Sequence, residues 1–216
     1  QPLAAIRNYA EGGIRRLERK NGDGSGIGEA LGQIAEQAGR AAQIIARVRG
    51  YMRKREPRRE VVDMNKAVEE AVNFFKHDAG KNAIHIELNL MPDLPGVMGD
   101  MIEIEQMIIN LGRNAIDAMA PAPDGIGEGS RHQDRLEIST KVAETGGMVR
   151  ISDTGPGLGD EEMDNVWQPF MTTKENGLGL GLAICRSIAE AHGGRIWAEP
   201  APIGGLSVIF FIPARD

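Results

Sequence analysis

The chain has 216 residues, with 31 acidic and 25 basic side chains and a formal net charge of −6. This acidic balance argues against a nucleic-acid-binding protein, whose binding surface is usually basic. The single cysteine, Cys185, excludes an internal disulfide and fits a reducing cytosol, and no apolar run is long enough to cross a membrane. We therefore expect a cytoplasmic chain of one or two domains. It begins with Gln1 and not with methionine, so we expect it to be a piece of a longer protein.

Residues 1–55 carry a helical pattern unlike the remainder. Apolar residues recur every three or four positions over about 1–20 and again over about 27–55, with a glycine-rich loop between them. The two segments predict a helical hairpin. Its apolar stripe favours pairing with a second copy into a dimeric four-helix bundle, and the alternative is packing against the following domain.

Strand and helix patterns are mixed from residue 57 onward. Pro57 ends the second helix, and Asp63 is placed to cap the next one. Helices are predicted over residues 64–80, 100–119, 160–166 and 178–191. Strands are predicted over 60–63, 84–90, 97–98, 135–142, 148–153, 195–199 and 206–212, with a glycine turn at 203–205. This order predicts an α+β sandwich of one mixed sheet with helices on one face.

A carboxylate followed by alternating glycines, Asp153-Thr154-Gly155-Pro156-Gly157, ends the strand predicted over 148–153. Glycine lets a flat ligand lie against the backbone, and a carboxylate accepts a hydrogen bond from an amino group such as that of adenine. Taken alone, the stretch fits an ordinary Asx turn between a strand and a helix better than a binding site.

The helix predicted over 100–119 has a polar stripe beside its apolar one. Asn110 and Asn114 lie one turn apart, so two side-chain amides face the same place. Amide oxygens are hard ligands that suit Mg²⁺ bound to phosphate groups, although alone the pair is more simply a solvated helix face. The polar stripe consists of Glu103, Gln106, Asn110, Asn114 and Asp117, and the apolar stripe of Ile104, Met107, Ile108, Leu111, Ala115 and Met119.

A surface segment follows, in which Trp167 and Phe170 are apolar anchors. Next to them, Thr172, Thr173 and Lys174 offer two hydroxyls and a cation to a phosphate group. A plain surface loop is the alternative interpretation.

Glycines at 177, 179 and 181 then open the helix predicted over 178–191. Backbone N–H groups of such a run converge on an anion at a helix N-terminus. The sequence patterns of dinucleotide folds and P-loops are absent here, and close helix packing is the alternative.

These motifs occur in one order along the chain: Asn110…Asn114, Asp153-x-Gly155-x-Gly157, Phe170, and Gly177-x-Gly179-x-Gly181. The order resembles the N, first glycine, F and second glycine boxes of the sensor histidine kinases of two-component systems. The opening segment, Gln1-Pro2-Leu3-Ala4-Ala5-Ile6, is similar to the one after the acceptor histidine in a nitrogen- or oxygen-sensing-type subgroup. The resemblance implies a dimerisation hairpin over 1–56 and an ATP-binding α/β sandwich of the Bergerat (GHKL) type over 57–216.

The resemblance also implies roles for individual residues. Asp153 would accept from the adenine amino group, with Gly155 and Gly157 close to the ring. Asn114 would coordinate Mg²⁺, with Asn110 alongside it as a catalytic residue.

In the same comparison, residues from Phe170 to Gly177 would form an ATP lid. Its Lys174 would meet the phosphates and act in catalysis. The other implied nucleotide contacts are Asp117, Thr172, Thr173, Leu178, Gly179, Leu180, Gly181, Leu182 and Ser207.

The implied activity is transfer of the γ-phosphoryl group of Mg-ATP to a histidine of the hairpin, for relay to an aspartate of a response-regulator receiver domain. Asn110 favours transfer over hydrolysis, because the ATPases of this fold typically carry a glutamate there as general base and an amide cannot act as one. The alternatives are a gyrase- or Hsp90-like ATPase and a nucleotide-binding dimer that only docks a partner.

The acceptor histidine of the family would lie just before Gln1, outside this sequence. The histidines present are His77, His85, His132 and His192, and none is on the hairpin. We read His77, His85 and His192 as ordinary helix or strand-edge residues. We do not expect this chain alone to phosphorylate itself.

Overall fold

The computed structural model describes residues 59–120, 134–143, 145–169, 171 and 179–214, together with Ile6, residues 8–12, Gly28 and residues 31–34. The chain divides into two compact units, Gln1–Lys54 and Arg55–Asp216. Residues 8–12 and 31–34 of the first unit are helical. Most of the predicted hairpin, and its dimer, lie outside the described residues. Among those residues there is no helix that is long and apolar enough to cross a membrane.

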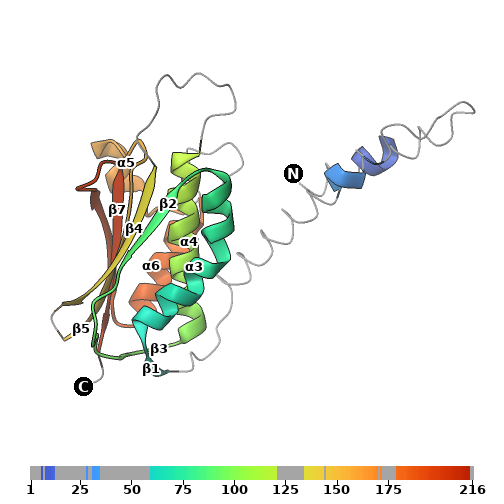
Figure 1. The fold of residues 1–216 in the computed structure, drawn as a ribbon. Helices are drawn as coiled ribbons and strands as arrows, with labels where there is room; N and C mark the ends of the chain where they lie inside the picture. The colour runs from blue at the N-terminus through green and yellow to red at the C-terminus, as the bar shows by residue number, and fades with distance from the viewer. Residues whose placement is uncertain are drawn as a thin grey trace, which may run out of the picture. The chain divides into compact units, whose positions relative to one another are not determined.

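The second unit is built of two layers, a five-stranded sheet with helices on one face (Figure 1). The strand order is β2-β4-β5-β7-β6. β2 (His85–Asn89) runs parallel to β4 (Arg135–Ala143). The antiparallel strands β5 (Gly146–Asp153), β7 (Leu206–Pro213) and β6 (Arg195–Pro200) complete the sheet. The predicted mixed sheet and α+β class are confirmed.

Three helices make the second layer, α3 (Met64–Lys81), α4 (Met101–Met119) and α6 (Gly181–Ala191), and α4 packs against both others (Figure 1). A short helix, α5 (Asp160–Asn165), precedes α6. Asp63 caps α3 as predicted, because its carboxylate accepts from the N–H groups of the first helical turn. The apolar stripe of α4 is buried along its whole length, which confirms the prediction for that helix.

Two details differ from the prediction. β1 (Glu60–Val62) and β3 (Val97–Gly99) pair with each other in a separate two-stranded sheet and do not join the main one. α6 begins at Gly181 and not at residue 178, because Gly179 has a φ of +62°, which lies outside the helical region. The second difference leaves a short non-helical turn before α6, at the place where the sequence predicts anion binding.

Candidate functional site

Asp153 is the last residue of β5, and only 5% of its surface is exposed. Its Oδ1 atom accepts hydrogen bonds from the backbone N–H groups of Gly155 at 2.9 Å and Leu206 at 3.3 Å. These two bonds fix the orientation of the carboxylate, and within the described residues both are made by Oδ1 and not by Oδ2. Burial raises the pKa of the Asp153 carboxyl above its usual range, and the two N–H donors offset part of that effect.

Glycines from two turns enclose this carboxylate. Gly205, in the turn between β6 and β7, has a φ of +76°, and a Cβ atom there would lie 2.5 Å from Asp153 Oδ1. Gly157 has a φ of +73°, and a Cβ atom there would lie 3.3 Å from the carbonyl oxygen of Gly205. We predicted only a turn at 203–205. The paired glycines were the signal available, but their contact with Asp153 depends on the pairing of β5 with β7.

The C-terminal half of α4 lies between the two glycine motifs. A Cβ atom on Gly155 would lie 3.4 Å from the carbonyl oxygen of Ala118, and one on Gly181 would lie 3.5 Å from Asn114 Nδ2. The loop after Asp153 and the start of α6 therefore flank the same stretch of α4. The structure brings together three of the predicted motifs.

Asn110 faces α6 from the middle of α4. It is half-buried, and its Nδ2 atom is buried with no hydrogen-bond partner among the described residues. Next to it, the Cys185 thiol donates to the carbonyl oxygen of Met107 at 3.7 Å. Burial raises the pKa of Cys185 to about 12, and the Asn110 side chain offsets part of that rise, so Cys185 is a packing residue. The Asn110 side chain therefore lies beside the Cys185 thiol, in the contact between α4 and α6.

Ser207 lies next to the Asp153 corner but is fully buried. Its Oγ atom is 2.7 Å from Oγ of Ser152, the residue opposite it on β5. The neighbouring residue on β7, Leu206, is the one whose N–H binds Asp153. Ser207 thus supports the strand that holds the carboxylate, and its predicted contact with a ligand stays a prediction.

The N-terminus of α6 has the geometry expected of an anion site. Leu180 is its N-cap residue, and its side chain accepts no hydrogen bond from the N–H groups of the first turn. The Leu180 side chain is buried and Leu182 packs against the core, so these residues would offer a ligand their backbone only. An uncapped helix N-terminus favours a phosphate group.

Two further residues of the predicted segments lie among the described residues. Asp117 is exposed on α4 and Trp167 packs against the core. In the described part of the chain no group of three or more His, Cys, Asp or Glu side chains could hold a metal ion. Outside the described residues lie Phe170, Thr172, Thr173, Lys174, Gly177 and Leu178.

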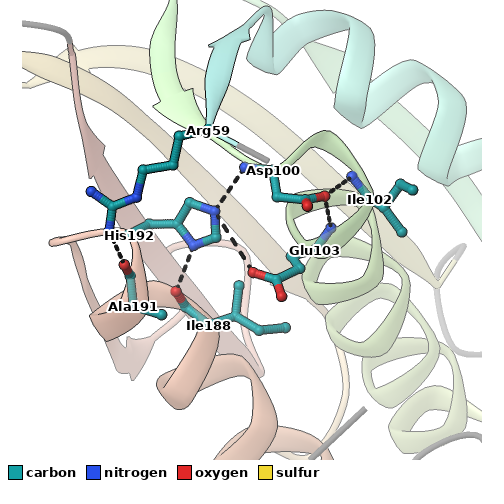
Figure 2. Close-up of polar contacts among 7 residues, drawn as sticks. All are labelled: Arg59, Asp100, Ile102, Glu103, Ile188, Ala191 and His192. Carbon is teal, nitrogen blue, oxygen red and sulfur yellow. Dashed lines mark hydrogen bonds and ion pairs between the residues drawn. The ribbon is translucent and has the colours of Figure 1, made fainter. Parts of the chain in front are cut away.

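His77 and His85 are exposed, as expected of surface residues, but His192 differs from the prediction. It is not an ordinary helix residue. It is the C-cap residue of α6, its side chain is 1% exposed, and both ring nitrogens are hydrogen bonded (Figure 2).

A family model described as histidine kinase-, DNA gyrase B-, and HSP90-like ATPase matches residues 99–216. The chain is 39% identical to the sensor protein FixL of Bradyrhizobium diazoefficiens over 100% of this chain and 41% of that protein. It is 35% identical to the sensor histidine kinase TmoS of Ectopseudomonas mendocina over 99% of this chain and 21% of that protein. The chain therefore spans less than half the length of these relatives.

Solved structures show the same fold. The catalytic domain of histidine kinase ThkA is 30% identical, with a TM-score of 0.61 over 72% of this chain and 95% of that one. Histidine kinase ThkA in complex with the response regulator protein TrrA matches over 100% of this chain and 58% of that one, with a TM-score of 0.69. At 24% identity, the second match is a likeness of fold alone.

Proposed function

The chain belongs to the family of histidine kinase-, DNA gyrase B- and HSP90-like ATPases and carries the catalytic domain of a sensor histidine kinase; on this premise we propose that its site binds Mg-ATP and delivers the γ-phosphoryl group to a histidine. The observation that carries the proposal is the orientation of Asp153. Two backbone N–H groups hold Oδ1, so Oδ2 is the acceptor for the exocyclic amino group of adenine. Gly155 and Gly157 leave room for the ring beside the backbone.

The phosphate end of the nucleotide would lie along α4, towards the start of α6. Asn114 is the proposed Mg²⁺ ligand, with Asn110 beside it and Asp117 near the end of the same face. Amide oxygens are the kind of ligand that Mg²⁺ accepts, and the ion bound with ATP would supply neutralisation of phosphate charge.

Two further elements would hold the phosphates. The N–H groups at the start of α6, from Gly179 to Leu182, would donate to phosphate oxygens. Lys174 would add a positive charge near the transferred group, with Thr172 and Thr173 as further donors in a lid that starts at Phe170.

The side chain of Asn110 directs the reaction towards transfer. An amide cannot take a proton from water as a general base does, so hydrolysis has no catalyst at this position. In the proposed step, an imidazole nitrogen of the acceptor attacks Pγ, and the bond between Pγ and the oxygen bridging to Pβ breaks to leave ADP. Catalysis then consists mainly of positioning and charge stabilisation.

The activity of the longer protein follows as part of the proposal. We propose that residues 1–55 dimerise, that the acceptor histidine precedes Gln1, and that the phosphoryl group passes to an aspartate of a response-regulator receiver domain in the cytoplasm. The FixL and TmoS relatives are a sensor protein and a sensor histidine kinase, and ThkA is found in complex with a response regulator protein. These matches support the proposal.

The test is incubation of the chain with γ-labelled ATP, Mg²⁺ and a companion hairpin that contains the acceptor histidine. We expect acid-labile label on the companion, and none when the chain carries Asp153→Asn. Acid-stable label would indicate transfer to serine or threonine and contradict the proposal. Release of phosphate without label would favour the ATPase alternative, and ATP binding without either product would favour the docking alternative.

A further inference from the structure

His192 lies between the end of α6 and the start of α4 (Figure 2). The backbone N–H of Asp100 donates to Nε2 at 2.9 Å, and Nδ1 lies 2.8 Å from the carbonyl oxygen of Ile188. Because an N–H group can only donate, Nε2 is the acceptor and carries no proton. Nδ1 then carries the proton and donates to Ile188. The contacts define a neutral ring in a single tautomer, with both nitrogens used.

Three charged groups face this ring or its helix end. The Glu103 carboxylate lies 3.9 Å from Nε2. The Asp100 carboxylate is turned to the N–H groups of its own helix, those of Ile102 and Glu103. The Arg59 guanidinium donates to the carbonyl oxygen of Ala191 at 2.9 Å (Figure 2). The end of α6 is therefore fixed to two segments, the first turn of α4 and the residue before β1.

The fit of the ring depends on Gly99, the residue before Asp100. A Cβ atom at that position would lie 2.8 Å from His192 Cδ2. Only glycine lets the ring approach the start of α4 this closely. The His192 contact is thus built from both elements and is not an accident of one side chain.

α6 contacts α4 at two further points between His192 and the turn at Gly179 and Leu180. The Cys185 thiol contacts the carbonyl oxygen of Met107, and Gly181 lies against Asn114. The 11 residues of α6 make a rod roughly 16 Å long. A rigid helix that shifts or tilts at its C-terminal end also moves at its N-terminal end. The position of the turn before α6, at Gly179 and Leu180, relative to the asparagines of α4 is therefore coupled to the His192 contact.

We propose that His192 is a positioning residue for the nucleotide site: through its neutral tautomer it seats α6 on the first turn of α4, and this holds the N-terminal turn of α6 opposite Asn110 and Asn114. The inference rests on the proposed function, because Mg-ATP is the ligand that the two helices would share. Arg59, the residue before β1, strengthens the same contact through its bond to the carbonyl oxygen of Ala191. A role in packing alone would lower stability and leave ligand affinity unchanged in the folded protein.

The test compares two substitutions of His192 at a temperature where circular dichroism shows every variant to be folded. His192→Phe keeps a planar ring but removes both polar atoms, and His192→Gln restores an acceptor for the Asp100 N–H. We expect His192→Phe to weaken Mg-ATP affinity by roughly fivefold or more, the low end of coupling between distant sites. His192→Gln should recover most of that loss. The matched control is Ile138→Val on β4, which removes buried volume from the sheet and should leave affinity unchanged.

Unchanged affinity in folded His192→Phe, or a His192→Gln variant no better than His192→Phe, would overturn the proposal. If His192→Phe does not fold, the nitrogen NMR shifts of the wild-type ring decide. A ring protonated at Nδ1 and not at Nε2 is expected, and a ring protonated at Nε2 overturns the assignment. Asp153→Asn is measured alongside. If that variant binds ATP as the wild type does, the proposed function itself has failed, and the His192 inference falls with it.

Discussion

The two ends of the candidate site are held by different parts of the molecule. Around Asp153, backbone N–H groups and glycines fix the carboxylate, and all of them lie where β5 ends and β7 begins. Around Asn110 and Asn114, the fixed points are contacts between two helices, α4 and α6. The orientation of Asp153 is fixed by backbone groups once β5 and β7 have paired. A contact between helices depends on how each helix is seated, so the phosphate end is the one that a change elsewhere in the chain can adjust.

The largest effect is expected at the sheet-built end. Asp153→Asn replaces an acceptor for the adenine amino group with an amide, whose N–H₂ would face the ligand donor if Oδ1 keeps its two backbone bonds. We expect ATP affinity to fall by about 100-fold, equivalent to about 2.7 kcal/mol, in calorimetric titration. The control is Asp63→Asn at the N-cap of α3, because aspartate and asparagine are both good N-cap residues.

The same variant has a predicted pH signature. Burial raises the pKa of Asp153 in the folded state, so the native protein keeps a proton that the unfolded chain has released. Stability should therefore fall as pH rises from the ordinary aspartate pKa through the raised one, and then stay level. Asp153→Asn should remove this fall and leave stability at neutral pH equal or higher. Denaturant unfolding between about pH 4 and pH 7 checks it, and parallel curves for the two proteins would contradict the assignment.

The next prediction distinguishes a clash with Asp153 from ordinary backbone strain in a turn. Gly204 and Gly205 both have positive φ, at +89° and +76°, but only a Cβ on Gly205 would meet Asp153, and one on Gly204 would have nothing within 4 Å. We expect Gly205→Ala to cost about 2 kcal/mol more unfolding free energy than Gly204→Ala, and to weaken ATP binding as well. Thermal unfolding and titration of both variants check this. Equal losses in the two variants would show that the Asp153 carboxylate can shift to make room for a Cβ atom on residue 205.

At the helix-built end, Asn114→Ala should affect only the metal-dependent part of binding. ATP affinity in Mg²⁺ should fall by about tenfold, or about 1.4 kcal/mol, while affinity in EDTA is unchanged. Asn73→Ala, on the exposed face of α3, is the matched control. A loss of the same size with and without Mg²⁺ would mean that Asn114 contacts the nucleotide and not the ion.

The smallest effect is expected for Ser207→Ala. The substitution leaves Ser152 Oγ buried without its 2.7 Å partner, and should cost about 1 kcal/mol of unfolding free energy. If Ser207 also contacts the adenine, ATP affinity will fall with it. A variant that is less stable but binds ATP normally would limit Ser207 to supporting β7.

The local pattern of the chain was enough to predict the elements that carry the site. The 3.6-residue period of α4 separated its buried stripe from Asn110 and Asn114, and the glycines after Asp153 marked the end of β5. The order of these motifs also predicted the family, which the comparisons confirm. Such features depend on neighbours in sequence, so they are readable without a structure.

The contacts between distant segments needed the tertiary structure. Gly205 and the Leu206 N–H reach Asp153 only because β7 pairs with β5, and β1 pairs with β3 outside the main sheet. His192 looked like an ordinary residue at a helix end, because its partner Asp100 lies 92 positions away. The sequence by itself determined which residues are able to bind a nucleotide. Only the fold decided which backbone groups and helix contacts hold them in place, because those depend on strand pairing and helix packing across the whole domain.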